Sequence, residues 1–301
     1  MASAASAEAP APTPSWLPLE SNPEVLNPFV KRLGLPDGYG FCDVFGLDDE
    51  LLMMVPQPCY ALCLLFPSPK ISPARRAELK EKVKKEGGAK QPENVFFIQQ
   101  VSLGPSVLKH YEGGTLKLIL TRTPLFCAHN RPTDRPTDRP TDRPTDRQHD
   151  GIGNACGTIA SIHAVANAAA GGAFALTEGS VLADFTAATA AMGCSERGRE
   201  LARTTALQEL SDATAAAGET EGAGTQDAQD SHFICFVHAG GTLYELDGRI
   251  WDEAGVAFPV NHGPTTPETF VSDAGKVIRE DFMARDPENM NFNVTAFCKL
   301  D

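Results

Sequence analysis

One of the eight cysteines stands where a loop turns into a helix. After Cys156, the residues Ile159, Ile162 and Val165 recur at helical spacing in an alanine-rich run. A sulfur in the first turn of a helix faces unpaired backbone N–H groups and the positive end of the helix dipole. Both favour the thiolate, which is the form of cysteine that attacks carbonyl carbons. Cys156 is therefore a candidate nucleophile, and the alternative is an inert structural cysteine, since most unpaired cysteines are buried.

A histidine and an aspartate frame a predicted β-hairpin downstream of this helix. Residues 231–237 have the aromatic and β-branched content of a buried strand, and a glycine-containing turn joins them to a second run at 242–249. His232 begins one arm and Asp247 ends the other, and these ends lie side by side in an antiparallel pair. A carboxylate that orients a histidine, which in turn activates a cysteine, is the thiol-protease form of the catalytic triad. We therefore predict that His232 and Asp247 act with Cys156.

The order and surroundings of these three residues resemble the ubiquitin carboxyl-terminal hydrolases, most closely the small single-domain members. The resemblance rests on NACGT at 154–158, HFICFV at 232–237 and LYELDGR at 243–249, and it extends through WLPLESNPE at 16–24, MVP at 54–56, FPVNHG at 258–263 and RDP at 285–287. It implies a thiol-dependent hydrolase that cleaves ester, thioester, amide or peptide bonds at the C-terminal glycine of ubiquitin, without a metal or cofactor. A ubiquitin-like modifier is the alternative partner.

The resembled family places a glutamine six residues before the nucleophile to donate to the oxyanion, and this chain departs from that pattern. Asp150 stands at that position. Joining Val101 to Ile152 restores the six-residue spacing and makes Gln100 the donor. Gln99 is the fallback if the junction lies elsewhere.

On this interpretation, residues 102–151 are a low-complexity insertion in a catalytic domain that spans 16–301. An Arg-Pro-Thr-Asp repeat fills 131–146, where regular prolines exclude a helix, and 116–120 is the only strand expected in the insertion. Residues 1–15 are rich in Ala, Ser and Pro and are predicted to be a disordered tail, not a signal peptide. An insertion that displaces Gln100 would favour a second function, ubiquitin binding with little or no turnover.

Substrate contacts follow from the resemblance alone. The ubiquitin tail is basic and the family meets it with acidic residues; Glu20, Glu24 and Asp43 match such positions, and Leu19 is expected to contact the apolar surface of ubiquitin. The alternative for the acidic residues is solvated surface. Beside the nucleophile, Gly157 is expected to leave room for a substrate backbone.

The resemblance implies an α/β (α+β) fold of the papain-like cysteine-protease type: a single domain with a central, mostly antiparallel sheet flanked by helices, and a knotted backbone path. Periodicity by itself indicates only α/β. Local patterns predict helices at 23–33, 73–86, 176–192, 195–210 and 266–284, a capped turn at 48–52, and strands at 41–45, 60–66, 95–98 and 292–297.

Two histidines and one loop are assigned no part in the chemistry. His163 lies well inside the helix that follows Cys156 and is predicted to be a packed residue, and His262 is predicted to be structural, within a turn at 261–263. Residues 250–256 form a loop longer than the usual turn of the family, and we expect this loop to change the rim of the cleft and not the triad.

Composition limits the remaining function classes. The formal net charge of −13 disfavours nucleic acid, whose phosphates would be repelled, and suits a basic protein partner, although acidity also serves solubility alone. No apolar run approaches the length of a membrane-spanning helix. The cysteines are scattered without C-x-x-C pairs, which argues against disulfides and zinc and indicates a reducing compartment. We expect a cytoplasmic monomer.

Overall fold

The computed structural model describes residues 16–101, 107–112, 115–120, 152–218 and 230–300. The chain divides into two compact units, one formed by Met1–Thr13 with Ser102–Gly151 and the other by Pro14–Val101 with Ile152–Asp301. In the first unit, β3 (Val107–Glu112) pairs antiparallel with β4 (Thr115–Leu120). The sequence predicted β4 but missed β3. The predicted N-terminal tail and the repeat at 131–146 lie outside the described residues.

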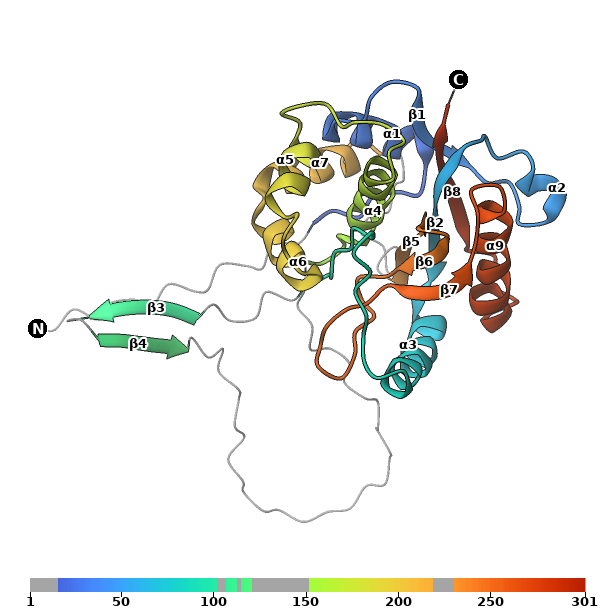
Figure 1. Ribbon diagram of the computed structural model, residues 1–301. Coiled ribbons are helices and arrows are strands. Elements are labelled where there is room, and N and C mark those ends of the chain that lie inside the picture. The colour runs from blue at the N-terminus through green and yellow to red at the C-terminus, as the bar shows by residue number, and fades with distance from the viewer. Residues whose placement is uncertain (1–15, 102–106, 113–114, 121–151, 219–229, 301) are drawn as a thin grey trace, which may run out of the picture. The chain divides into compact units, whose positions relative to one another are not determined.

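Six antiparallel strands form the sheet of the second unit, in the order β1-β8-β2-β5-β6-β7 (Figure 1). Their bounds are β1 (Tyr39–Asp43), β2 (Cys59–Pro67), β5 (Ser231–Ala239), β6 (Thr242–Leu246), β7 (Val260–Pro264) and β8 (Asn293–Lys299). The two long apolar strands, β2 and β5, lie at the centre, where both of their faces are covered. The predicted fold of helices around an antiparallel sheet is confirmed, whereas the knotted path stays a prediction.

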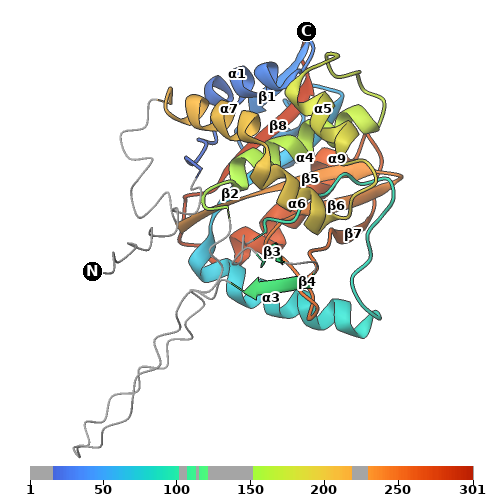
Figure 2. The same ribbon diagram turned by 90° about the vertical axis from the view of Figure 1, so that its left-hand side faces the viewer.

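Alternate residues of the central strands enter two hydrophobic cores on opposite faces of the sheet. Ala61 and Cys63 of β2 belong to the first core, and Leu62 and Leu64 belong to the second. The first core is covered by α1 (Pro23–Leu33), α4 (Cys156–Ala170), α5 (Val181–Ala188), α6 (Cys194–Arg203) and α7 (Thr205–Ala215). The second is covered by α2 (Asp49–Leu52), α9 (Phe270–Val277) and the π-helical turn η1 (Ile278–Phe282) (Figures 1 and 2).

Helix α4 runs through the first core and is enclosed along most of its length. Every residue from Gly157 to Ala168 is buried, and most of these residues are small or β-branched. The helix packs most extensively against β5 and β2, the two central strands. Small side chains let the helix approach the sheet closely, so the position of its first residue is fixed by packing.

The predicted strand at 95–98 is wrong. This segment forms no strand, because side chains of α4 satisfy its backbone: the Phe96 N–H donates to Asn167 Oδ1 at 2.8 Å and the Ile98 N–H donates to His163 Nε2 at 2.9 Å. His163 is fully buried, as predicted for a packed residue. Burial lowers its pKa to about 3, so the imidazole is neutral and able to accept this bond.

Several helix bounds also differ from the prediction. The helix expected at 195–210 is two helices, α6 and α7, because Thr204 between them leaves the helical conformation. Ser180 caps a shorter α5, and the last long helix begins at Phe270 and ends in η1 and the short turn η2 (Met283–Arg285). Helix α3 (Ser68–Lys85) begins five residues before the expected start at Pro73. In contrast, α1 has the expected Asn22 cap and the expected end at Gly34.

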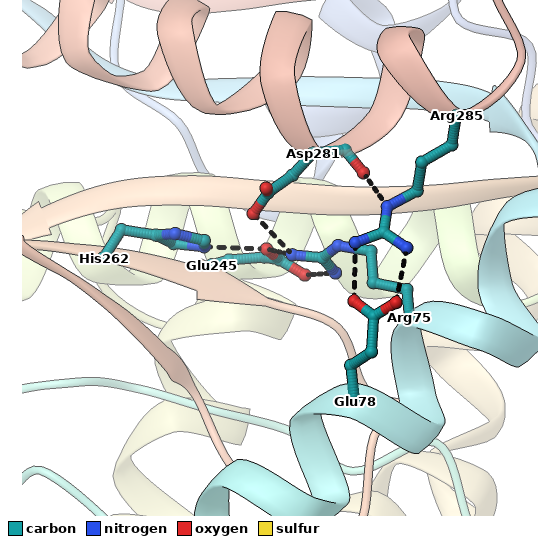
Figure 3. A network of polar contacts seen from close by, with 6 residues as sticks. All are labelled: Arg75, Glu78, Glu245, His262, Asp281 and Arg285. Atoms are coloured by element: carbon teal, nitrogen blue, oxygen red, sulfur yellow. Dashed lines mark hydrogen bonds and ion pairs between the residues drawn. The ribbon is translucent and has the colours of Figure 1, made fainter.

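A buried ion pair ties α3 to β6, and a histidine of the edge strand β7 contacts the same carboxylate (Figure 3). The Arg75 guanidinium donates two hydrogen bonds of 2.5 Å to Glu245, and the side chains are 4% and 0% exposed. Burial alone would raise the pKa of Glu245, but the charge of Arg75 and the bond to His262 lower it. His262, which lies in β7 and not in a turn, reaches the same carboxylate at 2.9 Å. Because Glu245 lies two residues before Asp247, this pair fixes the end of β6.

Replacing Arg75 by methionine is expected to lower the free energy of unfolding by about 3–5 kcal/mol, because Glu245 would keep a buried charge without its counter-ion. Arg285→Met is the matched control. Arg285 pairs with Glu78 near the surface (Figure 3), so its loss is expected to cost less than about 1 kcal/mol. Urea unfolding measures both values, and equal losses for the two variants would contradict the prediction.

Candidate active site

Cys156 is the first residue of α4, as predicted. The residue is partly exposed, whereas the helix that follows it is buried. Asn154 adopts φ of +59°, a left-handed conformation that asparagine tolerates better than most residues. The N-cap residue is Ala155, which has no side-chain acceptor. The N–H groups of the first turn are therefore left without a side-chain cap and point toward the sulfur end of the helix.

His232 and Asp247 meet at the end of the hairpin formed by β5 and β6. The strands pair Cys235 with Leu246, so the register places Asp247 diagonally across from His232 and on the same side. His232 Nε2 lies 2.7 Å from Asp247 Oδ1, and both side chains are buried. The Arg249 backbone N–H donates a second bond, 2.8 Å, to the same oxygen. The carboxylate therefore holds the imidazole in one orientation.

With Nε2 bound to Asp247, the other ring nitrogen of His232 is left for the thiol. Nδ1 is buried and makes no hydrogen bond of ordinary length within the described ranges. The ring and the Cys156 thiol are nevertheless close enough to shift the pKa of each other. Catalytic contacts are often long before substrate binds and shorten in the complex, so this geometry suits a cysteine–histidine pair that closes on substrate.

The charges at this site favour an ion pair of thiolate and imidazolium. Burial alone would raise the pKa of Cys156, but the neighbouring His232 imidazole and the positive charge of Arg249 lower it to about 6. Burial would lower the pKa of His232, but the negative charge of Asp247, its hydrogen bond to the ring and the nearby Cys156 together raise it. Burial would raise the pKa of Asp247, but the charge of His232, the hydrogen bonds from His232 and from the Arg249 N–H, and the charge of Arg76 together hold it well below its ordinary value. At neutral pH the cysteine is therefore a nucleophile.

Gln100 lies beside the loop that leads to Cys156. Its side-chain nitrogen Nε2 donates to the Ile152 carbonyl oxygen at 2.8 Å, and its Oε1 accepts from Arg249 Nε at 2.9 Å. The Ile152 N–H donates to the Val101 oxygen at 3.2 Å, so the two ends of the segment 102–151 lie next to each other. The Gln100 side chain thus contacts both the approach to the nucleophile and the turn after Asp247.

Gln99, the fallback donor, has its side chain committed elsewhere. Its Nε2 donates to the Gly255 carbonyl oxygen at 2.9 Å and its Oε1 accepts from the Ala257 N–H at 3.1 Å. Both partners belong to the loop after the hairpin and not to the approach to Cys156. Of the two glutamines, Gln100 is therefore the one that the fold brings to the candidate site.

Comparisons with known proteins identify the family of this chain. A sequence profile described as "Ubiquitin carboxyl-terminal hydrolase, family 1" matches residues 16–103 and 146–283. A ubiquitin carboxyl-terminal hydrolase of Drosophila melanogaster is 35% identical over 282 residues, which cover 94% of this chain and 96% of that protein. The chain belongs to the ubiquitin carboxyl-terminal hydrolase family. Members of this family are cysteine-type deubiquitinating enzymes, so the predicted enzyme class is confirmed.

Two other members of the hydrolase family match this chain over nearly its whole length, one in sequence and one in fold. The human ubiquitin carboxyl-terminal hydrolase isozyme L1 is 32% identical over 282 residues, covering 94% of this chain and 97% of that protein. The solved catalytic domain of Trichinella spiralis UCH37, bound to ubiquitin vinyl methyl ester, has a TM-score of 0.56 at 18% identity and covers 95% of this chain and 96% of that chain. At that identity the likeness supports the fold.

Of the predicted substrate contacts in this hydrolase, the acidic residues lie at or near the surface, whereas Leu19 is buried. Glu24 and Asp43 are exposed, and Glu20 is partly exposed beside Gly218. Leu19 is 5% exposed and packs in the first core, so the expected open apolar contact is not available. A Cβ on Gly157 would lie 3.1 Å from the Leu19 Cβ, and Gly157 therefore allows close packing of α4, not space for substrate.

Arg249 is the functional candidate that sequence reasoning missed. It donates to Gln100 through Nε and to Asp247 through its backbone, and its charge lowers the pKa of Cys156. The signal was available in the LYELDGR segment, where a charged residue follows the aspartate by two positions. In the part of the chain that the structure describes, no group of three or more His, Cys, Asp or Glu side chains is arranged to hold a metal ion.

Alkylation by iodoacetamide tests the electrostatics of the site without any substrate. We expect the rate at Cys156 to be constant above about pH 6 and to fall about tenfold per pH unit below it, because only the thiolate reacts. In His232→Ala the inflection is expected to move above the ordinary pKa of a thiol, since burial would then dominate.

Cys42 supplies an internal control for this measurement. It is partly exposed, and its contact with Cys298, together with burial, raises its pKa. Peptide mass spectrometry should find Cys42 unmodified while Cys156 reacts at pH 7. Equal labelling of the two cysteines, or an inflection for Cys156 near the ordinary thiol value, would contradict the thiolate–imidazolium pair.

Proposed function

We propose that this chain hydrolyses bonds at the C-terminal glycine of ubiquitin, with Cys156 as nucleophile, His232 as acid and base, and Asp247 as the group that orients the histidine. The observation that carries the proposal is the buried 2.7 Å bond between His232 and Asp247 beside a cysteine whose pKa is lowered to about 6. Family membership supports the same reaction class.

The first step is attack of the Cys156 thiolate on the carbonyl carbon of the glycine. The carbonyl becomes an oxyanion, which the Cys156 backbone N–H and the Gln100 side-chain amide are proposed to hold. The His232 imidazolium then gives its proton to the leaving amine or alcohol, and a thioester remains on Cys156. His232 next takes a proton from water, the hydroxide displaces the thiolate, and the carboxylate of ubiquitin is released. Asp247 stabilises the imidazolium in both halves of the reaction.

Ubiquitin is the proposed partner, and small adducts or precursors are the proposed substrates. Two solved neighbours in the fold comparison are complexes of UCH37 with ubiquitin vinyl methyl ester. The net charge of −13 and the exposed carboxylates of Glu24 and Asp43 suit the basic tail of ubiquitin. Glu20, beside Gly218, is proposed to contribute to the same acidic surface.

The protein is further proposed to work in the cytoplasm. Seven cysteines lie in the described part of the chain and all are free thiols, as expected of a reducing compartment. Among the described helices, none has the length and apolar character that crossing a membrane requires.

A fluorogenic ubiquitin C-terminal amide tests the proposed activity. Wild-type protein is expected to release the fluorophore, Cys156→Ala to release none, and Gln100→Ala to lose about 100-fold or more in kcat. Cys42→Ala is the matched control and should keep wild-type turnover. Tight binding of ubiquitin by the wild type without turnover would instead support the ubiquitin-binding function, and turnover confined to a ubiquitin-like substrate would reassign the partner.

Residues 102–151 are proposed to be an insertion that leaves the active site intact. The Ile152 N–H bonds to the Val101 oxygen, and Gln100 bonds to Ile152, so the described residues on either side of the junction contact one another directly. The profile match also omits residues between 103 and 146. This argues against displacement of Gln100 by the insertion.

Deleting residues 102–151 and joining Val101 to Ile152 through two glycines is expected to keep kcat within about threefold of the full chain, because loop-closure costs grow slowly with length. Removing 131–146 alone is the milder control and should change less. A loss of 30-fold or more in the deletion, with an unchanged melting temperature, would mean that the segment contributes to the site.

A further inference from the structure

The segment that carries Gln100 is not part of the sheet and is held by few backbone bonds. The Gln99 N–H donates to the Cys194 oxygen at 3.1 Å, and the Gln100 N–H donates to the Gly248 oxygen at 2.9 Å. Beyond Val101 the chain leaves the second unit for the first. The position of the proposed oxyanion donor therefore depends on contacts from neighbouring elements.

Two glycines pack closely against this segment. A Cβ on Gly198 of α6 would lie 2.0 Å from the Gln99 carbonyl oxygen, and a Cβ on Gly248 would lie 2.8 Å from the Gln100 nitrogen. Both separations are below any real contact of a Cβ, so backbone packs directly against backbone at each position. The segment thus lies in a slot between α6 and the turn after Asp247, where backbone contacts leave the side chains of Gln99 and Gln100 to set their own positions.

The loop at 250–257, here called the clamp loop, has an ordered structure of its own. Asp252 Oδ1 accepts from the backbone N–H groups of Ala254 and Val256 at 2.9 and 3.0 Å, and Trp251 forms a bridge with Ala257. Because its turn is internally bonded, the loop presents fixed backbone groups to whatever lies against it.

The clamp loop is also anchored to helix α3. The Lys80 ammonium lies 5.2 Å from the centre of the Trp251 ring, and Lys84 pairs with Glu253 at 2.7 Å. Beneath them, Ile250 packs in a small apolar cluster that partly buried side chains of α3 complete. The loop is therefore tied to the same helix whose Arg75 fixes the end of β6.

The Gln99 side chain joins the clamp loop to the donor segment. Both polar atoms of its side-chain amide bond to the backbone of the clamp loop: Nε2 donates to the Gly255 oxygen, and Oε1 accepts from the Ala257 N–H. A neighbouring β-strand would make the same pair of bonds. Its main chain is covalently joined to Gln100, whose own amide is bonded to Ile152 and Arg249.

We propose that Gln99 is a positioning residue for the oxyanion donor and that the clamp loop acts on catalysis through it. This inference rests on the proposed hydrolase function. It also replaces the expectation that the loop alters only the rim of the cleft. An amide that stabilises only the transition state changes kcat and leaves substrate binding unchanged, so loosening Gln99 should lower kcat with little effect on KM.

A double-mutant cycle on the full chain tests this with the fluorogenic ubiquitin amide. Gln99→Met keeps the length of the side chain and removes both hydrogen bonds, and it is expected to lower kcat about tenfold at unchanged KM, because displacement of a catalytic group by about 1 Å is costly. Combined with Gln100→Ala, the same substitution is expected to change kcat less than twofold, since the donor it positions is gone.

Gln91→Met is the matched control, because Gln91 also bonds to Ala257 of the clamp loop but is not joined to Gln100. It should keep kcat within about twofold of wild type. The positioning role would be overturned if the kcat losses of Gln99→Met and Gln100→Ala multiplied in the double variant. It would also be overturned if Gln91→Met lost as much kcat as Gln99→Met, or if Gln99→Met changed KM alone. Absence of turnover in the wild type would instead overturn the proposed function, and the inference with it.

Discussion

The arrangement of the candidate site depends on a buried hydrogen bond between an imidazole and a carboxylate. The side chains of His232 and Asp247 are both buried, so the charged form of each is stabilised by the other instead of by water. Their meeting requires a fixed register between β5 and β6, since a slip of one residue would turn one of them to the opposite face. The buried pair of Arg75 and Glu245 secures β6 just before Asp247, and the Arg249 N–H secures the carboxylate just after it.

The parts of the candidate site are held in different ways. Cys156 stands on a helix whose neighbours enclose it, so the position of the sulfur is set by close packing. The histidine and the aspartate stand on paired strands. Gln100 is held by none of these and depends on the slot between Gly198 and Gly248 and on the side chains of Gln99 and Arg249. A segment outside the helices and the sheet thus carries the residue on which stabilisation of the oxyanion is proposed to depend.

The sequence predicted the features that have short-range causes. Asn22 and Gly34 mark the ends of α1 because a cap and a left-handed glycine act within one turn, and the apolar run of β2 identifies a central strand. The position of Cys156 at the start of α4 and the pairing of His232 with Asp247 follow from the same local reasoning. The family resemblance gave the enzyme class, which composition and periodicity do not.

The errors lie where a distant side chain decides the local structure. Residues 95–98 have the composition of a strand, but Asn167 and His163 of α4 take the backbone bonds that a neighbouring strand would have made. Leu19 looked like a surface contact because nothing local indicates that it packs under α4. The role of Arg249 depends on Gln100, which is 149 positions away in the sequence.

The hydrogen bond between Ile152 and Val101 has an evolutionary consequence. Because the chain leaves and re-enters the catalytic unit at adjoining points, the geometry there places no demand on how many residues lie between them. A four-residue motif repeated in tandem is the kind of sequence that gains and loses copies when DNA is replicated. If residues 102–151 are the insertion proposed above, changes in repeat number would be neutral for the chemistry, because the residues on either side keep their contacts.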